Sequence, residues 1–212
     1  MADYINKDIL CQAYVHIDPV PLDEAELESF KAEIEKFLEA RGRFFVYEAV
    51  DTSVELKEGS LKVYATIVGA IYIAIGQYGS FRSGVDFLAS DVKRLSETIV
   101  SESLFLTRSR HGNIKRVEAR IGVVGSLKKI VDEIDYIKSQ VGEVDPGALA
   151  KRIDKLREDV LRMLGNLNDP QDEPYIKENL HELIEENVPA APQSPPKKPA
   201  TDEPESVTPD VT

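Results

Sequence analysis

The sequence predicts an α+β protein, with a small N-terminal strand–helix–strand–strand unit, a helical bundle and a disordered tail. Three observations lead to this fold class. Short runs rich in strand-forming residues gather in the first sixty residues. Later runs place apolar residues at alternating intervals of three and four, which is typical of helices that pack on one another. The last 25 residues are rich in proline and almost free of large apolar side chains.

The strand signals in the first unit fall in three short runs. Residues 10–17 (LCQAYVHI) are rich in strand formers, and turn residues follow them. Residues 43–50 (RFFVYEAV) and 53–58 (SVELKE) predict two further strands. Between the first two runs, Asp23 and Glu26 resemble a capping box, which predicts the start of a helix. We expect that helix to end at Arg41-Gly42.

The most unusual segment is the uncharged run of residues 63–81, VYATIVGAIYIAIGQYGSF. Residues 61–75 include the first part of this run and two residues before it. This stretch is longer than a typical strand, so we expect a helix there. The run of 19 residues is close to the roughly 20 that a membrane span requires. It contains tyrosines, Gln77, Ser80 and three glycines, however, which favours a helix buried in protein. Membrane insertion is the alternative.

Small residues recur at every fourth position in and after this segment. Gly76, Ser80 and Gly84 form one such series, and Ala65 and Gly69 form another. Small residues four apart let two helix backbones approach closely. We therefore expect this face to pack on another helix, either within the chain or in a second copy.

Four helices are predicted from residue 82 onward, at about 82–106, 127–137, 149–167 and 174–186. Asp145 and Pro146 mark the start of the third of these helices. Its apolar seam consists of Leu149, Ile153, Leu156, Val160, Met163 and Leu167, and it predicts contact with a partner helix in the same chain or another. Residues 114–124 fit either a helix or a strand, because two glycines interrupt the pattern.

We expect the chain to divide into four parts: a small α/β unit (1–60), an apolar helix followed by a helical bundle with a basic cluster (61–140), a hairpin-like helical segment (146–187), and a disordered acidic, proline-rich tail (188–212).

Charge is distributed unevenly along the chain, whose formal net charge is −12. Residues 1–60 hold 14 acids and 6 bases, whereas residues 61–140 hold 8 acids and 12 bases. The basic residues that we single out are Arg108, Arg110, Lys115, Arg116, Arg120, Lys128 and Lys129. Such a cluster can bind an acidic protein segment or anionic lipid, or it can balance the acidic helices of the same chain. The strongly acidic composition and the lack of a nucleic-acid-binding motif argue against nucleic acid as the partner.

No pattern for catalysis or metal binding is present. The three histidines, His16, His111 and His181, are far apart in sequence, and zinc-binding and phosphate-cradling motifs are absent. Cys11 with His16 or His111 is the one conceivable nucleophile pair, but a cysteine in a strand is usually buried and inert. We therefore expect no cofactor, no metal and no small-molecule substrate. A single cysteine and the lack of a signal-peptide pattern favour the cytoplasm, with membrane association as the alternative.

These observations predict a non-enzymatic interaction or assembly module that works by helix–helix packing, as a homo-oligomer or as a subunit of a larger complex. One alternative is a membrane-acting effector or toxin of the defence type that inserts residues 63–81. Another is an enzyme whose site has no recognisable motif.

Overall fold

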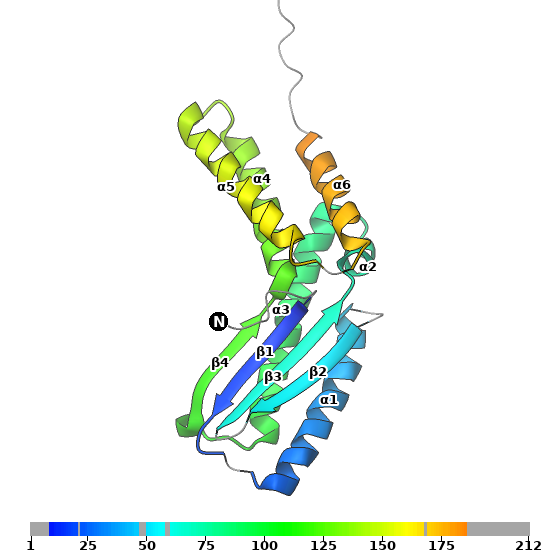
Figure 1. The fold of residues 1–212 in the computed structure, drawn as a ribbon, viewed down its shortest axis with the longest axis vertical. Coiled ribbons are helices and arrows are strands. Elements are labelled where there is room, and N and C mark those ends of the chain that lie inside the picture. The colour runs from blue at the N-terminus through cyan, green and yellow to red at the C-terminus, as the bar shows by residue number, and fades with distance from the viewer. Residues whose placement is uncertain (1–8, 21, 47–49, 58–59, 168, 186–212) are drawn as a thin grey trace, which may run out of the picture.

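The computed structural model describes residues 9–20, 22–46, 50–57, 60–167 and 169–185 (Figure 1). The elements of its first part are β1 (Ile9–Ile17), α1 (Glu24–Val46), β2 (Val50–Lys57), β3 (Leu61–Gly69), α2 (Ile71–Gly76) and α3 (Phe81–Leu106). A short 3₁₀ turn (His111–Asn113) leads into β4 (Ile114–Arg120), α4 (Gly122–Gln140), α5 (Pro146–Leu164) and α6 (Asp172–Glu185).

The four strands form one antiparallel sheet in the order β2-β3-β1-β4. Val15 of β1 lies opposite Val63 of β3 on one side and Val117 of β4 on the other. Helices α1 and α3 cover one face of this sheet, and no helix of the described residues covers the other face (Figure 1). The βαββαβ order, with β1 and β3 in the middle, is that of the split βαβ fold. This fold serves many functions, so it does not by itself indicate one.

The core lies between the sheet and its two helices. In β3 every second side chain is buried, and these four side chains face the helices: Leu61, Val63, Ala65 and Ile67. Helix α1 contributes Phe30, Ile34 and Leu38 to the core, and α3 contributes Val85, Leu88, Val92, Leu95 and Ile99. The predicted α+β class is confirmed, and so is the helix expected over 82–106.

The helix expected over residues 61–75 is wrong. Residues 61–69 are the central strand β3, and only residues 71–76 are helical. The burial alternates residue by residue, as in a strand with one face on the core, and does not follow a helical period. The lack of charge in 63–81 thus reflects a strand hydrogen-bonded on both edges, followed by the short buried helix α2. Among the described residues, no helix combines the length and apolar character needed to cross a bilayer.

The predicted boundary between the first helix and the second strand is also wrong. The capping box at Asp23 is confirmed, because its carboxylate accepts from the Glu26 N–H (2.9 Å) and its N–H donates to the Glu26 carboxylate (3.1 Å). Helix α1 does not end at Arg41-Gly42, however, but continues to Val46. Phe45 packs on the core from that extra turn. The strand predicted over 43–50 is therefore wrong, because residues 43–46 lie in α1, whereas the strand predicted over 53–58 corresponds to β2.

Residues 114–124, for which helix and strand were both open, contain the strand β4 and the first residues of α4. Both β3 and β4 pair with β1. The boundary that we expect at residue 60, between the α/β unit and the helical part, therefore falls inside the sheet. The N-terminal sheet thus extends in sequence to Arg120. The tail expected over 188–212 lies outside the described residues.

Candidate functional site: a basic groove between two helices

Helices α4 and α5 form a hairpin that extends away from the end of the sheet (Figure 1). The turn between them is defined by Gly142, whose φ of +89° suits glycine, and by the N-cap of α5. At that cap the Asp145 carboxylate accepts from the Ala148 N–H (2.9 Å), and Pro146 follows at the first helical position. The predicted start of this helix is thus confirmed.

A groove runs along one side of this hairpin, from the end of β4 between α4 and α5, with a volume of about 990 Å³. This volume is at the upper end of the range for ligand pockets. Its apolar lining includes Val123 and Ile130 from α4 and Leu156 and Met163 from α5. Charged side chains from both helices lie around these apolar residues.

The charges that line the groove are predominantly positive. Five cationic residues line it, namely Arg120, Lys129, Arg152, Lys155 and Arg162, against two carboxylates, Glu133 and Asp159. Arg152 donates two hydrogen bonds to the Glu133 carboxylate, at 2.7 and 3.0 Å. These hydrogen bonds hold the pKa of Glu133 below its ordinary value. Arg162 pairs with Asp159 at 3.1 Å, so both carboxylates are already engaged.

Two lysines keep their charge available at the groove. Lys129 lies on α4 and Lys155 on α5, one on each wall, and both are exposed. Within the described part of the chain neither ammonium has a carboxylate oxygen within ion-pairing distance. The guanidinium of Arg152, also on α5, lies 4.1 Å from the ring centroid of Tyr136. This contact holds a further cation on the α5 wall of the groove.

The end of the groove nearest the sheet is formed by Arg120 and the start of α4. Arg120 is held by Gln12, whose side-chain oxygen accepts from it at 2.7 Å, and by an ion pair with Glu118. Gly122 has a φ of +45°, and a Cβ at this position would lie 1.9 Å from the Ile9 carbonyl oxygen. Only glycine therefore allows α4 to begin this close to β1. The first turn of α4 has no side-chain cap and no acidic residue, so its dipole adds positive potential here.

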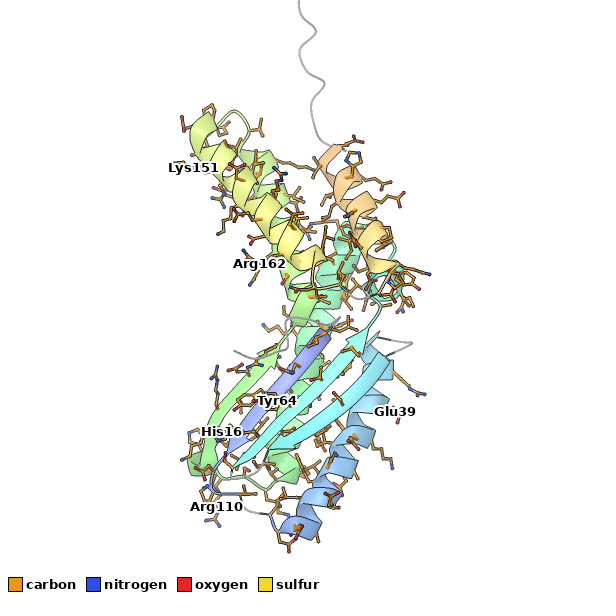
Figure 2. The ribbon with its side chains drawn as sticks, in the orientation of Figure 1. His16, Glu39, Tyr64, Arg110, Lys151 and Arg162 are labelled. Atoms are coloured by element: carbon orange, nitrogen blue, oxygen red, sulfur yellow. The ribbon has the colours of Figure 1, made fainter. Side chains whose placement is uncertain are left out.

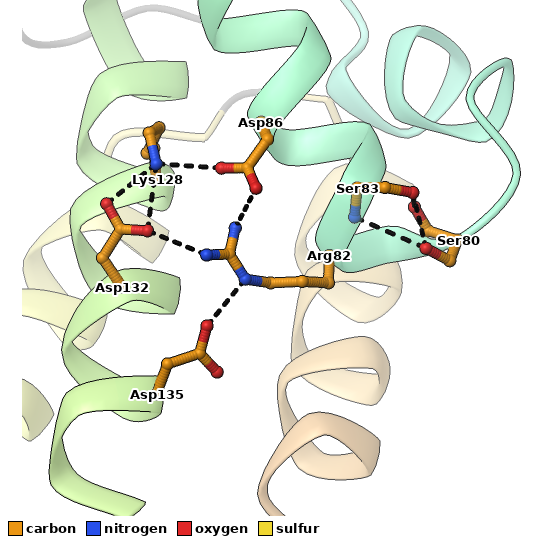
Figure 3. Close-up of polar contacts among 7 residues, drawn as sticks. All are labelled: Ser80, Arg82, Ser83, Asp86, Lys128, Asp132 and Asp135. Carbon is orange, nitrogen blue, oxygen red and sulfur yellow. Dashed lines mark hydrogen bonds and ion pairs between the residues drawn. The ribbon is translucent and has the colours of Figure 1, made fainter. Parts of the chain in front are cut away.

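Lys128, which the sequence places in the basic cluster, lies outside the groove in a network with α3 (Figure 3). Its ammonium contacts Asp86 at 2.8 Å and Asp132 at 2.9 Å. Arg82 of α3 contacts Asp86 (2.6 Å), Asp132 (3.1 Å) and Asp135 (2.7 Å). Burial alone would raise the pKa of Asp86, but hydrogen bonds from Lys128 and Arg82 outweigh it and lower that pKa. Lys128 thus balances acids of α3 and α4.

The basic cluster does not form the single surface that its sequence suggests. Arg116 pairs with Glu118 on the sheet face without helices. Arg108, Arg110 and Lys115 lie near the other end of β4, where Figure 2 labels Arg110 far from Arg162. Only Arg120 and Lys129 of the predicted set reach the groove, where they meet cations of α5 that sequence reasoning missed.

The predicted face of small residues is divided among three elements. Gly69 ends β3, Gly76 ends α2, and Ser80 is the N-cap of α3, where its hydroxyl accepts from the Ser83 N–H. Gly84 is the one member that does allow close helix packing. A Cβ there would lie 2.7 Å from Cγ2 of Ile75 and 2.9 Å from its carbonyl oxygen. This packing, of α2 on α3, lies within the chain.

The predicted seam of α5 also packs mainly within the chain. Met163 is buried, and Leu156, Val160 and Leu167 pack against the core from partly buried positions. Two members of the seam are exceptions: Ile153, with 47% of its surface exposed, and Leu149, which is partly exposed and does not pack on the core. The seam therefore attaches α5 to the rest of the molecule, and the groove lies along its edge.

The nucleophile pair considered from the sequence is not assembled. Cys11 and His16 are five residues apart in β1, so their side chains point to opposite faces of the sheet. Burial raises the pKa of the Cys11 thiol to about 12. His111 lies exposed in the 3₁₀ turn, and His181 lies 3.2 Å from Glu185 on α6. The described residues contain no group of side chains that could hold a metal ion.

The open face of the sheet carries a second group of polar and aromatic side chains. Tyr14 and Tyr64 lie side by side on the two central strands, with ring centroids 4.8 Å apart. The guanidinium groups of Arg116 and Arg120 lie over the Tyr14 ring, which is only 7% exposed. Since an aromatic platform for nucleic-acid bases needs exposed rings, Tyr14 does not provide one.

A comparison of the chain with protein-family models, curated proteins and solved structures finds no match.

Proposed function

We propose that this chain is a non-enzymatic protein-interaction module that docks an acidic segment of a partner protein in the groove between α4 and α5. The observation that supports the proposal is the presence of two exposed lysines, Lys129 and Lys155, on opposite walls of one groove. The other three cations of the lining are each paired with a carboxylate: Arg120, Arg152 and Arg162. The rest of the molecule is strongly acidic, so the groove is a local positive site on a chain with a net charge of −12. Charge complementarity of this kind steers an acidic partner and selects against basic ones.

A binding role suits the groove better than a catalytic one. Its two carboxylates are engaged by Arg152 and Arg162, so neither is free to act as a general base. Its lining contains no histidine and no cysteine. The lining does contain two lysines that, among the described residues, have no carboxylate oxygen within ion-pairing distance. It also contains five apolar side chains, of which Ile121 and Leu156 are partly exposed. This combination suits an acidic segment that also carries an apolar residue.

The membrane alternative has less support. Insertion of residues 63–81 requires β3 to leave both β1 and β2, because β3 is hydrogen-bonded to each of them. That change would expose the buried side chains of β3 and break the sheet in its middle. Dye release from anionic vesicles tests this alternative directly, and we expect none.

The proposal is tested by fluorescence anisotropy with a labelled peptide rich in glutamate and leucine. We expect binding that weakens as salt is raised, because the contacts are between charges. The double variant Lys129→Glu/Lys155→Glu should lose about tenfold or more in affinity. Lys151→Glu is the matched control, since Lys151 is exposed on the same helix and does not line the groove.

Equal affinity of wild type and the double variant would contradict the proposal. Light scattering on the same samples measures self-association and so tests the homo-oligomer alternative. A dimer that persists in the double variant would show that assembly uses another surface.

A further inference from the structure

We infer that the acidic segment Asp202–Asp210 of this chain binds in the groove between α4 and α5 and competes there with an acidic partner. The inference rests on the proposed function, because it assigns a second, intramolecular occupant to the same site. A partner segment then binds only when this segment leaves, so the segment lowers the apparent affinity of the groove for its partner.

The charge of the segment complements that of the groove. Asp202–Asp210 reads DEPESVTPD and holds four acids and no base, whereas residues 188–201 before it hold two lysines and no acid. Lys129 and Lys155 stand exposed on opposite walls of the groove, and neither has a carboxylate oxygen within ion-pairing distance among the described residues. The segment therefore supplies the carboxylates that these two lysines lack, and Val207 supplies an apolar residue between them.

The place where α6 ends brings the segment near the groove. Figure 1 shows that α6 and the hairpin of α4 and α5 extend from the same end of the sheet. The Lys138 ammonium, near the end of α4, donates to the carbonyl of Leu183, which lies in the last turn of α6. This bond holds the end of α6 against the hairpin. The chain therefore continues from Glu185 beside the helix that forms one wall of the groove.

The length of chain after α6 is sufficient to reach the groove. Lys129 precedes Lys138 by nine residues, which is about 14 Å along α4 and half a turn around it. A path around α4 adds about its diameter of 10 Å, so the whole path is roughly 25 Å. Asp202 follows Glu185 by 17 residues, which span at most about 60 Å. The segment thus reaches both lysines without full extension of the linker.

A second set of cations lies too far away to compete equally. Arg108, Arg110 and Lys115 lie near the other end of β4, where Figure 2 labels Arg110. From Lys115 to Lys138 the strand and helix together cover about 40 Å, before any path around the molecule is added. A linker stretched toward its limit has few conformations, which lowers the effective concentration of the segment there. The groove is therefore the favoured basic site.

The test measures competition in the full-length chain. Its probe is the labelled peptide of glutamate and leucine described above, followed by fluorescence anisotropy. In the tail variant, the four acids of Asp202–Asp210 are replaced by their amides. We expect the probe to bind this variant about fivefold more tightly than wild type. That factor corresponds to an effective concentration of about 1 mM and a segment Kd of about 0.25 mM.

A matched control separates competition from a general change in charge. The tail variant raises the formal net charge by four, from −12 to −8. The control raises it by the same amount through glutamine at four exposed positions of α1, which lies against the sheet: Glu24, Glu28, Glu33 and Glu39. We expect this control to change the affinity for the probe by less than about twofold, because exposed charges far from the groove are screened by salt. An equal gain in both variants would overturn the inference.

A spin label locates the segment directly. Ser206→Cys places one reactive thiol in the segment, since Cys11 is fully buried and its pKa is raised to about 12. We expect the label to broaden the NMR signals of the Ser126 and Leu156 amides, which belong to the two walls of the groove. The signal of Lys115 should keep its width. The double variant Lys129→Glu/Lys155→Glu should abolish the broadening.

The outcomes distinguish this inference from the proposed function. If the probe binds wild type and the tail variant equally and the label leaves the groove signals sharp, the segment does not occupy the groove, while partner docking stands. If the label broadens those signals but the probe binds neither protein, the groove holds only the chain's own segment and the proposed function falls. If the label has no effect and the probe does not bind, both are wrong.

Discussion

The carboxylate of Asp172 caps a helix that lies a hundred residues earlier in the chain. Its two oxygens accept from the N–H groups of Ile71 (3.0 Å) and Tyr72 (2.8 Å), at the start of α2. Asp172 is itself fully buried at the start of α6. This contact fastens α6 to α2, and the rings of Tyr72 and Tyr175 pack beside it, with centroids 6.3 Å apart.

Replacing Asp172 with alanine should destabilise the protein by about 1–3 kcal/mol, since two backbone donors lose their partner in a buried place. Urea unfolding followed by circular dichroism measures the change. Glu173→Ala is the control, because that side chain is half exposed and pairs with Lys177 on the same helix. A loss from Asp172→Ala no larger than that from Glu173→Ala would show that the cap contributes little.

Gly84→Ala should reduce the free energy of unfolding by about 1–3 kcal/mol, since the new methyl group would overlap the side chain and carbonyl of Ile75. Gly76→Ala should leave it within about 0.5 kcal/mol, because a Cβ there meets nothing within 4 Å. Thermal and urea unfolding of the two variants measure this difference. If both glycines tolerate alanine equally, the close approach of α2 to α3 is not required.

Acid should weaken the network around Asp86. Its folded pKa lies below the ordinary 3.8, so the stabilisation is present above that value and is lost as pH falls through the folded pKa. With 43% of the side chain exposed, solvent screening limits the effect to less than about 1 kcal/mol. Urea unfolding at several pH values from about 7 to 3 should show this loss in wild type and a smaller one in Asp86→Asn. Parallel curves for the two proteins would rule out the contribution.

The thiol of Cys11 should not react in the folded protein. It is fully buried, and its raised pKa of about 12 leaves almost no thiolate near neutral pH. A colorimetric thiol reagent should therefore detect no thiol in the native chain and one per chain in concentrated urea, which is the internal control. Rapid modification of native protein would reopen the enzyme alternative.

The periodicity of apolar residues predicted most helices. The helix expected over 61–75 was wrong because it depended on the length and lack of charge of the segment and not on its periodicity. The alternation of Leu61, Val63, Ala65 and Ile67 is the pattern of a strand, but the run stays uncharged as far as Phe81, so charge does not separate this strand from the helix that follows. No proline or charge marks the break at Ala70, so the end of β3 and the start of α2 had no clear signal. Similarly, the glycine at position 42 resembled a helix end, although α1 continues past it.

Only some of the cations that line the groove can be predicted from the sequence. Lys129 and Arg120 belong to a contiguous basic run, which drew attention to them. Lys155 is 26 residues beyond Lys129, and the four residues on either side of it hold three acids and three bases, so no local excess of positive charge marks it. The turn signals at Asp145 and Pro146 did predict a new helix there. Antiparallel packing of the helices on either side of that turn would have brought the two lysines onto facing walls.

The strand order has a consequence for synthesis of the chain. Strand β1 is made first, yet both of its neighbours, β3 and β4, come later, and β4 begins about a hundred residues after it. At about 5–20 residues per second, the ribosome needs roughly 5–20 s to supply that last strand. Until then one edge of β1, with its run of buried side chains, has no partner. A nascent chain that stalls before Arg120 therefore leaves β1 as a sheet edge whose backbone groups are unpaired, and such an edge favours aggregation.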